Sequence, residues 1–574
     1  MSQMHLVKLY RTQVKKLNKN YKMSISRNII MAVLMAAIAT LLAGCGRWAH
    51  NPKHPEKLVV IKEIVEEDMP VLEGETLYNP DIIAQLYSKS ENLLSVIWER
   101  RENIDQMLYA IRNVKVDGLN PEDYHLSSIE ELAQKIIASD TANIKDIAYL
   151  ELLLTDSFLL LSTHLAGGKT DSETIDPQWR ASKRIVRLDL LGFIDTTLHN
   201  NRILKGLQEL TPKHREYLNL KNALTEYRQF KQNGGWETFS TQLPKLELGM
   251  RHLDVILLRN RLAITQSCIE HDIEDEDLFD SLLYAHVILF QTRNGLTADG
   301  VVGKGTIEAM NIPVESRIAA IEANLERWRW LSDDLGERYI KVNIANFELQ
   351  VIENDNTVFI TDAIVGKAFR ETPVFSSVMT YMVLNPDWTV PPTILNEDIV
   401  PAVISNPNYL SKKKLKIFNT DGVEIDPITL DWSSFTAGGF PYKIQQNPGP
   451  DNALGSVKFI FPNKYSVYIH DTPNRSLFKR TDRSFSSGCI RVDNPLRLAA
   501  WLLKDNLKWT PTQLNEAIAK GKTQTVRFKN PIPVHIVYLT AWASNDGVVY
   551  FRKDVYNRDK VLLAALKQRP PKTN

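Results

Sequence analysis

A cysteine in a turn of small residues is the most reactive feature of the sequence. Cys489 follows Ser-Ser-Gly at 486–488, and small residues let backbone amides approach a substrate closely. Arg491 lies two positions further on, and a nearby positive charge favours the thiolate form of a cysteine. His470 ends a predicted strand nineteen positions before Cys489. These residue types support a thiol nucleophile with a histidine base, although a structural cysteine and a surface ion-pairing arginine fit the same pattern.

The remaining cysteines and the histidines indicate no metal chemistry. Three cysteines in 574 residues cannot form a disulfide framework, and no two have the spacing of a zinc site. Cys268 lies in amphipathic surroundings, which predicts a buried structural thiol. None of the twelve histidines forms a metalloprotease helix motif. We therefore expect chemistry that needs no metal and no other cofactor.

Composition excludes some classes of protein. With 44% hydrophobic and 24% charged residues, the chain can build real cores, so a wholly disordered or collagen-like protein is excluded. Its length suggests about three or four domains. Lys and Arg number 69 against 68 Asp and Glu, a net charge of +1. This balance gives no electrostatic reason to expect a nucleic-acid partner.

The N-terminus has the features of an export signal. Seven basic residues occur within 1–27, and seventeen uncharged, mostly apolar residues follow at 28–44. A transmembrane helix needs about 20 apolar residues, so this run suits a signal-peptide core better than a membrane span. Its end, LAGC at 42–45, resembles the lipobox of bacterial lipoproteins, which implies cleavage before Cys45 and acylation of its thiol. Gly46, directly after the cysteine, resembles the pattern of lipoproteins that are sorted to an outer membrane. The alternative interpretation of the N-terminus is a signal anchor in the inner membrane.

Two helical regions precede the reactive segment. Apolar residues recur at helical spacing from about 76 to 242, which predicts an all-α scaffold without visible chemistry. At 284–311 a helical pattern is followed by Asn-Gly and Asp-Gly turns and a second short helix. The glycines here superficially suggest a nucleotide loop, but no strand precedes them. The segment resembles the small three-helix peptidoglycan-binding domain of cell-wall enzymes.

After an amphipathic helix at 317–331 the apolar period changes from helix to strand. An Asp-Gly pair at 546–547 marks a hairpin turn. Between Pro391 and Pro450 the strand pattern is interrupted. An insertion of this length in a compact β domain predicts a lid or cap. Strands are predicted at Tyr339–Val351, Val358–Val365, Val374–Leu384, Val457–Phe461, Ser466–His470, Val534–Ala543 and Val548–Arg552.

The reactive segment resembles the active-site motif of L,D-transpeptidases with the YkuD-type catalytic domain. In that family a His precedes a Ser/Thr-His-Gly-Cys box by about fifteen to twenty residues, and a hydrophobic residue and Arg or Asn follow the box. His470, Gly488 and Arg491 occupy the matching positions, whereas Ser487 stands where many members have His. The resemblance is closest to the large, multi-domain Gram-negative type, which has a scaffold domain, a peptidoglycan-binding domain and a capping subdomain.

The resemblance implies a role for each site residue. Cys489 would attack the carbonyl between the third residue, a diamino acid, and the fourth, D-Ala, of a stem tetrapeptide, releasing D-Ala. His470 would act as general base and then as general acid. Gly488 and Cys489 would supply oxyanion amides, and Ser487 and Arg491 would support the substrate. Tyr468 and Trp388 are further substrate-side candidates, which core packing explains almost as well.

The histidine needs a partner that orients it. Asp471 is a poor candidate because successive strand residues point to opposite faces. The family implies the backbone carbonyl that follows the histidine instead.

The expected partners are donor and acceptor stem tetrapeptides and carbapenem-type inhibitors. We expect the protein to lie in the periplasm, attached to the outer membrane by its lipid anchor. The expected reaction is a 3→3 crosslink through a cysteine thioester. With water as acceptor the same site would make an L,D-carboxypeptidase or endopeptidase, and with a lipoprotein lysine it would anchor that lipoprotein. A non-catalytic peptidoglycan-binding lipoprotein is the third alternative.

The sequence thus predicts an α+β multi-domain protein. We expect five parts: a lipoprotein-type signal peptide at 1–44, a tether at 45–75, an all-α scaffold at 76–250, a three-helix peptidoglycan-binding domain at 256–313, and a β-rich YkuD-like catalytic domain at 316–565 with a cap inserted at about 391–450.

Overall fold

The computed structural model describes most of the chain after the N-terminal segment, and these residues form two compact units. The first unit takes the described residues of Met1–Asp105 and Ser127–Asp156, and the second takes Gln106–Leu126 and Ser157–Asn574. The predicted signal peptide, Cys45 and Cys268 lie outside the described residues. The described residues are 55–66, 71–72, 74–88, 98, 100–138, 143–181, 184, 188–266, 275–435, 439–506 and 508–570.

The first unit is helical, with one short hairpin. A buried carboxylate organises it: Asp156 accepts hydrogen bonds from the backbone nitrogens of Tyr78 (3.0 Å) and Asn79 (2.8 Å), just before a helix begins. Such N–H groups have no partner inside the helix, so the side chain satisfies them. The elements are α3 (Pro55–Glu66), β1 (Val71–Leu72), β2 (Glu75–Thr76), α4 (Pro80–Ser88), α6 (Leu126–Ala138) and the first half of α7 (Ile144–Gly167); α5 (Arg101–Asn113) begins here.

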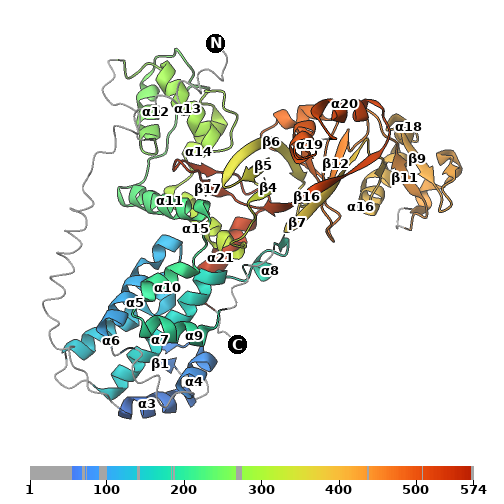
Figure 1. The fold of residues 1–574 in the computed structure, drawn as a ribbon. Helices are drawn as coiled ribbons and strands as arrows, with labels where there is room; N and C mark the ends of the chain where they lie inside the picture. The colour runs from blue at the N-terminus through green and yellow to red at the C-terminus, as the bar shows by residue number, and fades with distance from the viewer. Residues whose placement is uncertain are drawn as a thin grey trace. The chain divides into compact units, whose positions relative to one another are not determined.

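The second unit contains one long helix, α15 (Val314–Trp330), between its helical part and its β-rich part. Its side chains Ile321, Leu325 and Trp328 are buried in the same core as the large sheet. The helix α15, which was predicted from its amphipathic pattern, therefore shares its core with the sheet and connects the helical part to the β-rich part. The other elements here are η2 (Val114–Asp117), η3 (Pro121–Tyr124), α8 (Ser172–Ile175), α9 (Leu190–His199), α10 (Ile203–Leu210) and α11 (Arg215–Gln232) (Figure 1).

A separate small core forms the three-helix part, with α12 (Leu253–Ala263), α13 (Ser281–Arg293) and α14 (Lys304–Met310). The Gln291 side chain holds the predicted Asp-Gly turn, donating to Asp299 Oδ1 (2.9 Å) and accepting from the Gly300 nitrogen (2.8 Å). Gly300 has φ +73°, and a Cβ there would overlap the Tyr284 ring. Only glycine fits this turn, which explains the pattern seen in the sequence.

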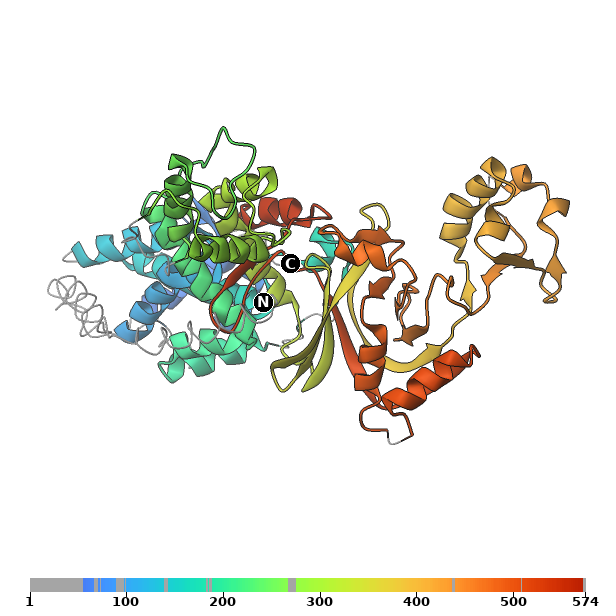
Figure 2. The same cartoon turned by 90° about the horizontal axis from the view of Figure 1, so that it is seen from above.

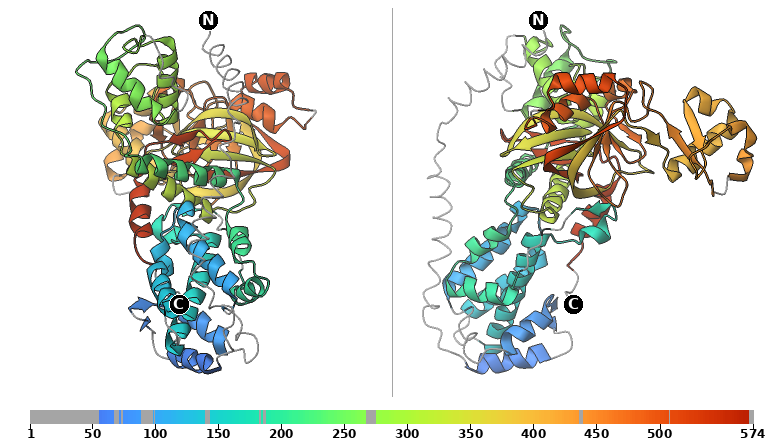
Figure 3. Two further views of the ribbon diagram at one scale, coloured as in Figure 1. Left: turned by 90° about the vertical axis from the view of Figure 1, so that its left-hand side faces the viewer. Right: turned by 45° about the vertical axis from the view of Figure 1, so that its right-hand side comes forward.

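A ten-stranded sheet forms the core of the β-rich part, and the pairing of β12 with β7 closes it on itself. Closure pairs backbone groups that would otherwise lie open at a sheet edge. The strands twist strongly around the core (Figure 3). They are β3 (Trp179–Arg180), β4 (Arg338–Asn343), β5 (Glu348–Glu353), β6 (Asn356–Gly366), β7 (Val374–Leu384), β12 (Val457–Ile460), β13 (Ile469–His470), β14 (Ser484–Ser486), β15 (Ile490–Val492) and β16 (Gln524–Val537).

The predicted insertion has its own sheet and its own core, so it is a subdomain and not a loop (Figure 2). Val400, Leu410 and Ile417 are among its buried side chains. Its elements are β8 (Trp388–Thr389), α16 (Pro392–Ile394), the π-helix η4 (Leu395–Ile399), α17 (Val400–Ser405), α18 (Tyr409–Lys412), β9 (Leu415–Phe418), β10 (Glu424–Ile425), η5 (Pro427–Thr429), η6 (Trp432–Phe435) and β11 (Lys443–Gln446).

The fold class is as predicted, with corrections to individual elements. The hairpin around 546–547 is present, formed by β17 (Ala541–Ala543) and β18 (Val549–Phe551). The strand predicted over Ser466–His470 is shortened to β13, because Ser466 adopts a left-handed conformation with φ +56°. Four helices have no counterpart among the predicted elements: η7 (Arg475–Lys479), α19 (Pro495–Leu502), α20 (Pro511–Ala519) and α21 (Arg558–Leu566). No helix among the described residues has both the length and the hydropathy to cross a membrane.

Candidate active site

Adjacent parallel strands bring the cysteine and the histidine segments together. β13 pairs with β15 so that Ile469 lies opposite Ile490 and His470 opposite Arg491. Both isoleucines are fully buried in the core, so His470 and Arg491 belong to the opposite face of the sheet. The Ile490 nitrogen donates to the Tyr468 oxygen (3.0 Å), which places Cys489, just before β15, beside Tyr468.

His470 is buried and oriented by the backbone. Its Nδ1 lies 2.5 Å from the carbonyl oxygen of Asp471, the neighbour predicted from the family resemblance. Since a carbonyl only accepts, Nδ1 carries the proton and Nε2 is left as the basic nitrogen. The Asp471 carboxylate binds elsewhere, accepting from the nitrogens of Ser456 (2.7 Å) and Thr472 (2.6 Å) and from Arg475. As expected, the neighbouring carboxylate does not orient the ring.

The electrostatic surroundings keep His470 neutral. Burial lowers the pKa of His470 to about 3, and the positive charges of Arg491 and Lys458 act in the same direction. The hydrogen bond to the Asp471 carbonyl opposes these effects without cancelling them. At neutral pH the imidazole is therefore neutral, and its Nε2 is available to accept a proton.

Cys489 is half-buried and rests as a thiol. Its Sγ lies 3.7 Å from the carbonyl oxygen of Ser466. Burial raises the pKa of the Cys489 thiol, although Tyr468, Lys458 and Arg491 each act to lower it. The expectation that Arg491 favours the thiolate is correct in direction, but the net shift is the opposite because desolvation is larger. The resting pair is thus a neutral thiol and a neutral imidazole.

Tyr468 is directed toward the reacting sulfur. Burial raises the pKa of its hydroxyl well above the ordinary value, and the interaction with Cys489 acts in the same direction. The hydroxyl also interacts with the Trp388 side chain, and the Tyr468 ring centroid lies 5.5 Å from that of His470. A tyrosine that stays protonated can donate a hydrogen bond to a thiolate as it forms. Both aromatic candidates from the sequence therefore lie near Cys489.

The turn before Cys489 corrects one expectation about the oxyanion donors. Gly488 has φ +108°, a conformation that favours glycine. Its nitrogen already donates to Ser486 Oγ (3.1 Å), while that hydroxyl donates to the Cys489 oxygen (2.5 Å). The Cys489 nitrogen has no acceptor among the described residues. Of the two predicted amides, only that of Cys489 is available to an oxyanion, because the turn itself uses the other.

Ser487 connects the cysteine turn to the cap. It is exposed, and its Oγ accepts a hydrogen bond from Arg370 (3.0 Å). Arg370 also pairs with two carboxylates of η4, Glu397 (2.6 Å) and Asp398 (2.5 Å). The residue that replaces the commoner histidine is thus one end of a polar network that reaches the cap. Sequence reasoning missed Arg370, which lies 117 positions before Ser487.

Thr372 is a second residue that sequence reasoning missed. It is fully buried, and its hydroxyl donates to the Gly488 oxygen (2.8 Å) and accepts from the Gly366 nitrogen (2.9 Å). Tyr556 donates to the Gly366 oxygen (2.7 Å) and supports the same strand end. Thr372 therefore fixes the cysteine turn to β6. A single threonine between β6 and β7 carries no sequence signal of this role.

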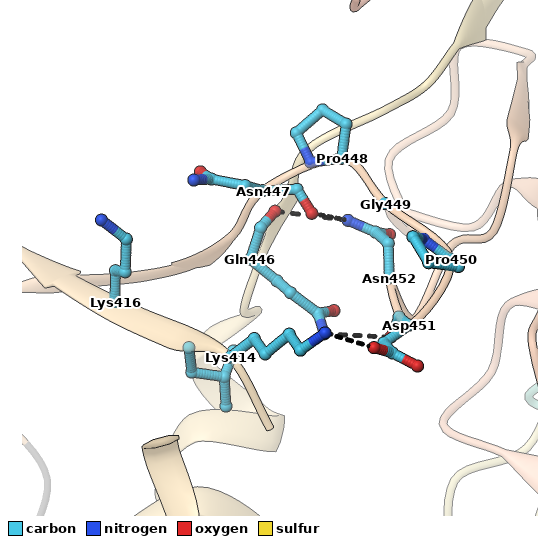
Figure 4. A pocket seen from close by; sticks show the side chains of 10 residues that line it. Lys414, Lys416, Gln446, Asn447, Pro448, Gly449, Pro450, Asp451 and Asn452 are labelled. Carbon is cyan, nitrogen blue, oxygen red and sulfur yellow. Dashed lines mark hydrogen bonds and ion pairs between the residues drawn. The ribbon is translucent and has the colours of Figure 1, made fainter. Parts of the chain in front are cut away.

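A hollow of about 390 Å³ lies where the cap chain returns to the catalytic part, at residues 446–452 and 414–416 (Figure 4). Lys414 pairs there with Asp451 (2.6 Å), and the Gln446 amide donates to the Asp451 oxygen (3.0 Å). None of the residues of the cysteine site lines this hollow. Within the described residues, no cluster of three His, Cys, Asp or Glu side chains could hold a metal ion.

Comparison with known families identifies three regions of the chain. Residues 337–530 match the L,D-transpeptidase catalytic domain (YkuD), 81–224 match the scaffold domain, and 251–310 match the putative peptidoglycan binding domain. A putative L,D-transpeptidase of Haemophilus influenzae is 38% identical over 221 residues, which are 38% of this chain and 44% of that protein. The alignment thus spans less than half of the curated relative.

Two solved structures are more distant. A crystal structure of the L,D-transpeptidase from Xylanimonas cellulosilytica is 14% identical, with a TM-score of 0.19, covering 52% of this chain and all of that chain. The Ldtfm–avibactam carbamoyl enzyme is 12% identical, with a TM-score of 0.17, covering 39% of this chain and 63% of that one. Scores this low carry no argument about the site. The chain therefore contains an L,D-transpeptidase catalytic domain of the YkuD type, together with a scaffold domain and a putative peptidoglycan binding domain.

Proposed function

We propose that the chain forms 3→3 crosslinks between peptidoglycan stem peptides through a cysteine thioester. One observation carries the proposal: the half-buried thiol of Cys489 comes just before β15, which pairs with the strand that ends in the neutral, backbone-oriented His470, and the Cys489 amide has no acceptor among the described residues. This arrangement provides a nucleophile, a base and an oxyanion donor. The scaffold and peptidoglycan-binding domains fit a polymeric wall substrate.

The acylation step follows from the protonation states. Nε2 of His470 takes the thiol proton as Sγ of Cys489 attacks the carbonyl carbon of the third stem residue. The Cys489 amide donates to the oxyanion, and Tyr468 donates to the developing thiolate. When the tetrahedral intermediate collapses, the C–N bond breaks and His470 returns the proton to the amine of D-Ala. A thioester remains on Cys489.

The second step determines the product. The side-chain amine of a second stem peptide attacks the thioester, His470 removes the proton of that amine, and the thiol is reprotonated as it leaves. Water in place of the amine would give a carboxypeptidase or endopeptidase, and a lipoprotein lysine would give anchoring. The acceptor is therefore what the experiment must identify.

Mass spectrometry of products from the purified full chain and disaccharide-tetrapeptides tests the proposal. We expect a crosslinked dimer and free D-Ala from the native enzyme, neither from Cys489→Ala, and at most a trace from Cys489→Ser, because a hydroxyl has a far higher pKa than a thiol. His470→Ala should lose about 10²–10⁴-fold in rate. Cys268→Ala is the matched control and should keep full activity and the single carbapenem adduct. D-Ala release by Cys489→Ala would contradict the mechanism.

We also propose that Cys45 carries the lipid of an outer-membrane lipoprotein, since the uncharged run at 28–44 ends in the LAGC sequence. Labelled palmitate should enter the native chain and be absent from Cys45→Ala. A mature protein that begins before residue 45 would contradict the proposal.

A further inference from the structure

Three basic side chains lie in a row across three strands at the site. Lys458 on β12 is opposite His470 on β13, and His470 is opposite Arg491 on β15. Residues directly opposite on neighbouring strands have Cβ atoms about 5 Å apart and share one face. The alternate residues Phe459, Ile469 and Ile490 are fully buried in the core. Strand register therefore places two cations on either side of the candidate base.

Neither cation has a counterion among the residues that the structure describes. No carboxylate of the described residues forms an ion pair with Lys458 or Arg491, and Nε of Arg491 is buried without a hydrogen-bond partner. The Lys458 ammonium instead lies 3.8 Å from the centroid of the Tyr468 ring. Asp387 attracts Lys458 only at longer range. Burial of unpaired charge is unfavourable, and burial lowers the pKa of both groups.

We propose that Lys458 and Arg491 form a carboxylate-binding site that holds a carboxylate of the donor peptide next to Cys489. The inference rests on the proposed function. The leaving residue of that donor ends in a free carboxylate two bonds from the scissile nitrogen, so the group must lie within a few ångströms of the reacting sulfur. Any side-chain carboxylate of the diamino acid is the second possible source of the same chemistry.

Binding a carboxylate there would also affect the base. Both cations lower the pKa of His470, Arg491 more than Lys458. An anion between them cancels part of this field, so His470 becomes more basic when the donor is bound. The site thus couples recognition of the substrate to proton removal from Cys489.

The test compares Lys458→Met with the native chain on three tetrapeptide donors: the free acid, the C-terminal amide, and a peptide amidated at the side-chain carboxylate of the diamino acid. Methionine keeps an unbranched apolar chain over Tyr468 and removes the charge. Since a hydrogen bond to a charged group contributes about 1.5–3 kcal/mol, kcat/KM for the free acid should fall about 10- to 100-fold. Lys458→Arg should recover part of this loss.

The pattern across donors identifies the carboxylate. If Lys458 binds the D-Ala carboxylate, native enzyme and Lys458→Met should turn over the C-terminal amide equally poorly, and they should differ on the side-chain amide. The reverse pattern assigns the diamino-acid carboxylate. Equal losses on all three donors, or no loss on the free acid, would overturn the inference and leave the proposed function intact. Only absence of turnover by the native enzyme would contradict the proposed function.

Lys464→Met is the matched control. Lys464 is exposed and lies 5.5 Å from the ring centroid of Tyr465, in the segment between Lys458 and His470. This variant also removes a lysine beside a tyrosine, but at a position outside the row. It should match the native chain on every donor; a loss as large as that of Lys458→Met would show that general positive charge, and not the site, explains the effect.

Discussion

Two groups of buried basic side chains in the same compact unit have opposite surroundings. On α15, Arg329 pairs with Glu326 (2.6 Å) and Arg327 with Asp559 (2.5 Å). Burial acts against the charge of Arg329, yet Glu326, Tyr217 and Asp117 together outweigh burial, so the pKa of Arg329 is raised. Arg491 has no such carboxylate partner in the described part of the chain, and burial lowers the pKa of Arg491. The comparison separates charges that the fold neutralises itself from charges left for a ligand.

The Arg329–Glu326 pair of α15 has several further hydrogen-bond partners. Arg329 also donates to the Asp117 carbonyl (2.7 Å), and Glu326 accepts from the nitrogen (2.7 Å) and hydroxyl (2.8 Å) of Thr170. Tyr217 donates to the Asp117 carboxylate (2.8 Å). These contacts join the helical part to α15, so the cluster has a structural role. The row at the active site has no comparable set of partners, and we expect its loss to affect turnover more than folding.

The largest expected effect on stability is from breaking the α15 pair. Arg329→Met leaves the Glu326 carboxylate buried without its cation, which should reduce the free energy of unfolding by about 3–5 kcal/mol. Urea unfolding of the full chain, followed by hydrogen exchange of α15 peptides, measures it. The double variant Glu326→Gln with Arg329→Met removes the stranded charge and keeps an acceptor for Thr170. It should regain part of the loss; no regain would contradict the electrostatic explanation.

A smaller effect is expected at the cysteine turn. Thr372→Val keeps the shape of the side chain but leaves the Gly488 oxygen and the Gly366 nitrogen without their buried partner, at a cost of about 1–3 kcal/mol. Because the same change releases the Cys489 turn, kcat should fall while KM changes less. Steady-state kinetics measure the split. Thr420→Val, at an exposed position of the cap, is the control, and equal kinetics for both variants would rule out a positioning role for Thr372.

Lowering the pH should reduce the stability of the protein, because His470 is neutral in the folded state. The unfolded chain binds its proton near pH 6.5 and the folded chain only at about pH 3, so stability falls as pH decreases through this window. From pH 7.5 to 5.5 the contribution of this histidine should decrease by about 1.4 kcal/mol. His470→Gln should lack this part of the loss in urea unfolding at the two pH values. An identical pH dependence for both proteins would mean that His470 titrates normally in the folded state.

The smallest effect on folding is expected at Lys458. Replacing an unpaired, half-buried cation by an apolar side chain of similar length is often neutral or stabilising, so Lys458→Met should stay within about 0.5 kcal/mol of the native chain. A small change in stability for Lys458→Met and a large one for Arg329→Met would confirm that the active-site row and the α15 pair differ in structural role. Destabilisation comparable to that of Arg329→Met in the same urea experiment would mean that Lys458 also has a structural role.

The sequence predicted the reactive residues and the kinds of domain, because both are local properties. The spacing of His470, Gly488, Cys489 and Arg491 is a motif along the chain. Helical and strand periods are also visible within short windows, which is why the helix predicted at 317–331 is found as α15 and a hairpin is found at the predicted Asp-Gly turn. The helices α19 and α20, which were not predicted, lie between strand patterns, and α21 follows the last strand; all three are short, and a few residues give weak periodicity.

The partners of those reactive residues were decided only by tertiary structure. Lys458 is twelve positions from His470 and unremarkable in the sequence, yet the β12–β13 register places it opposite the base. Thr372 and Arg370 reach the cysteine turn from more than a hundred positions away. Likewise, the net rise in the pKa of the Cys489 thiol depends on burial. Strand register, burial and long-range contacts arise only when the chain closes its sheet, so local sequence determines which groups can react and the tertiary structure determines their charge, orientation and neighbours.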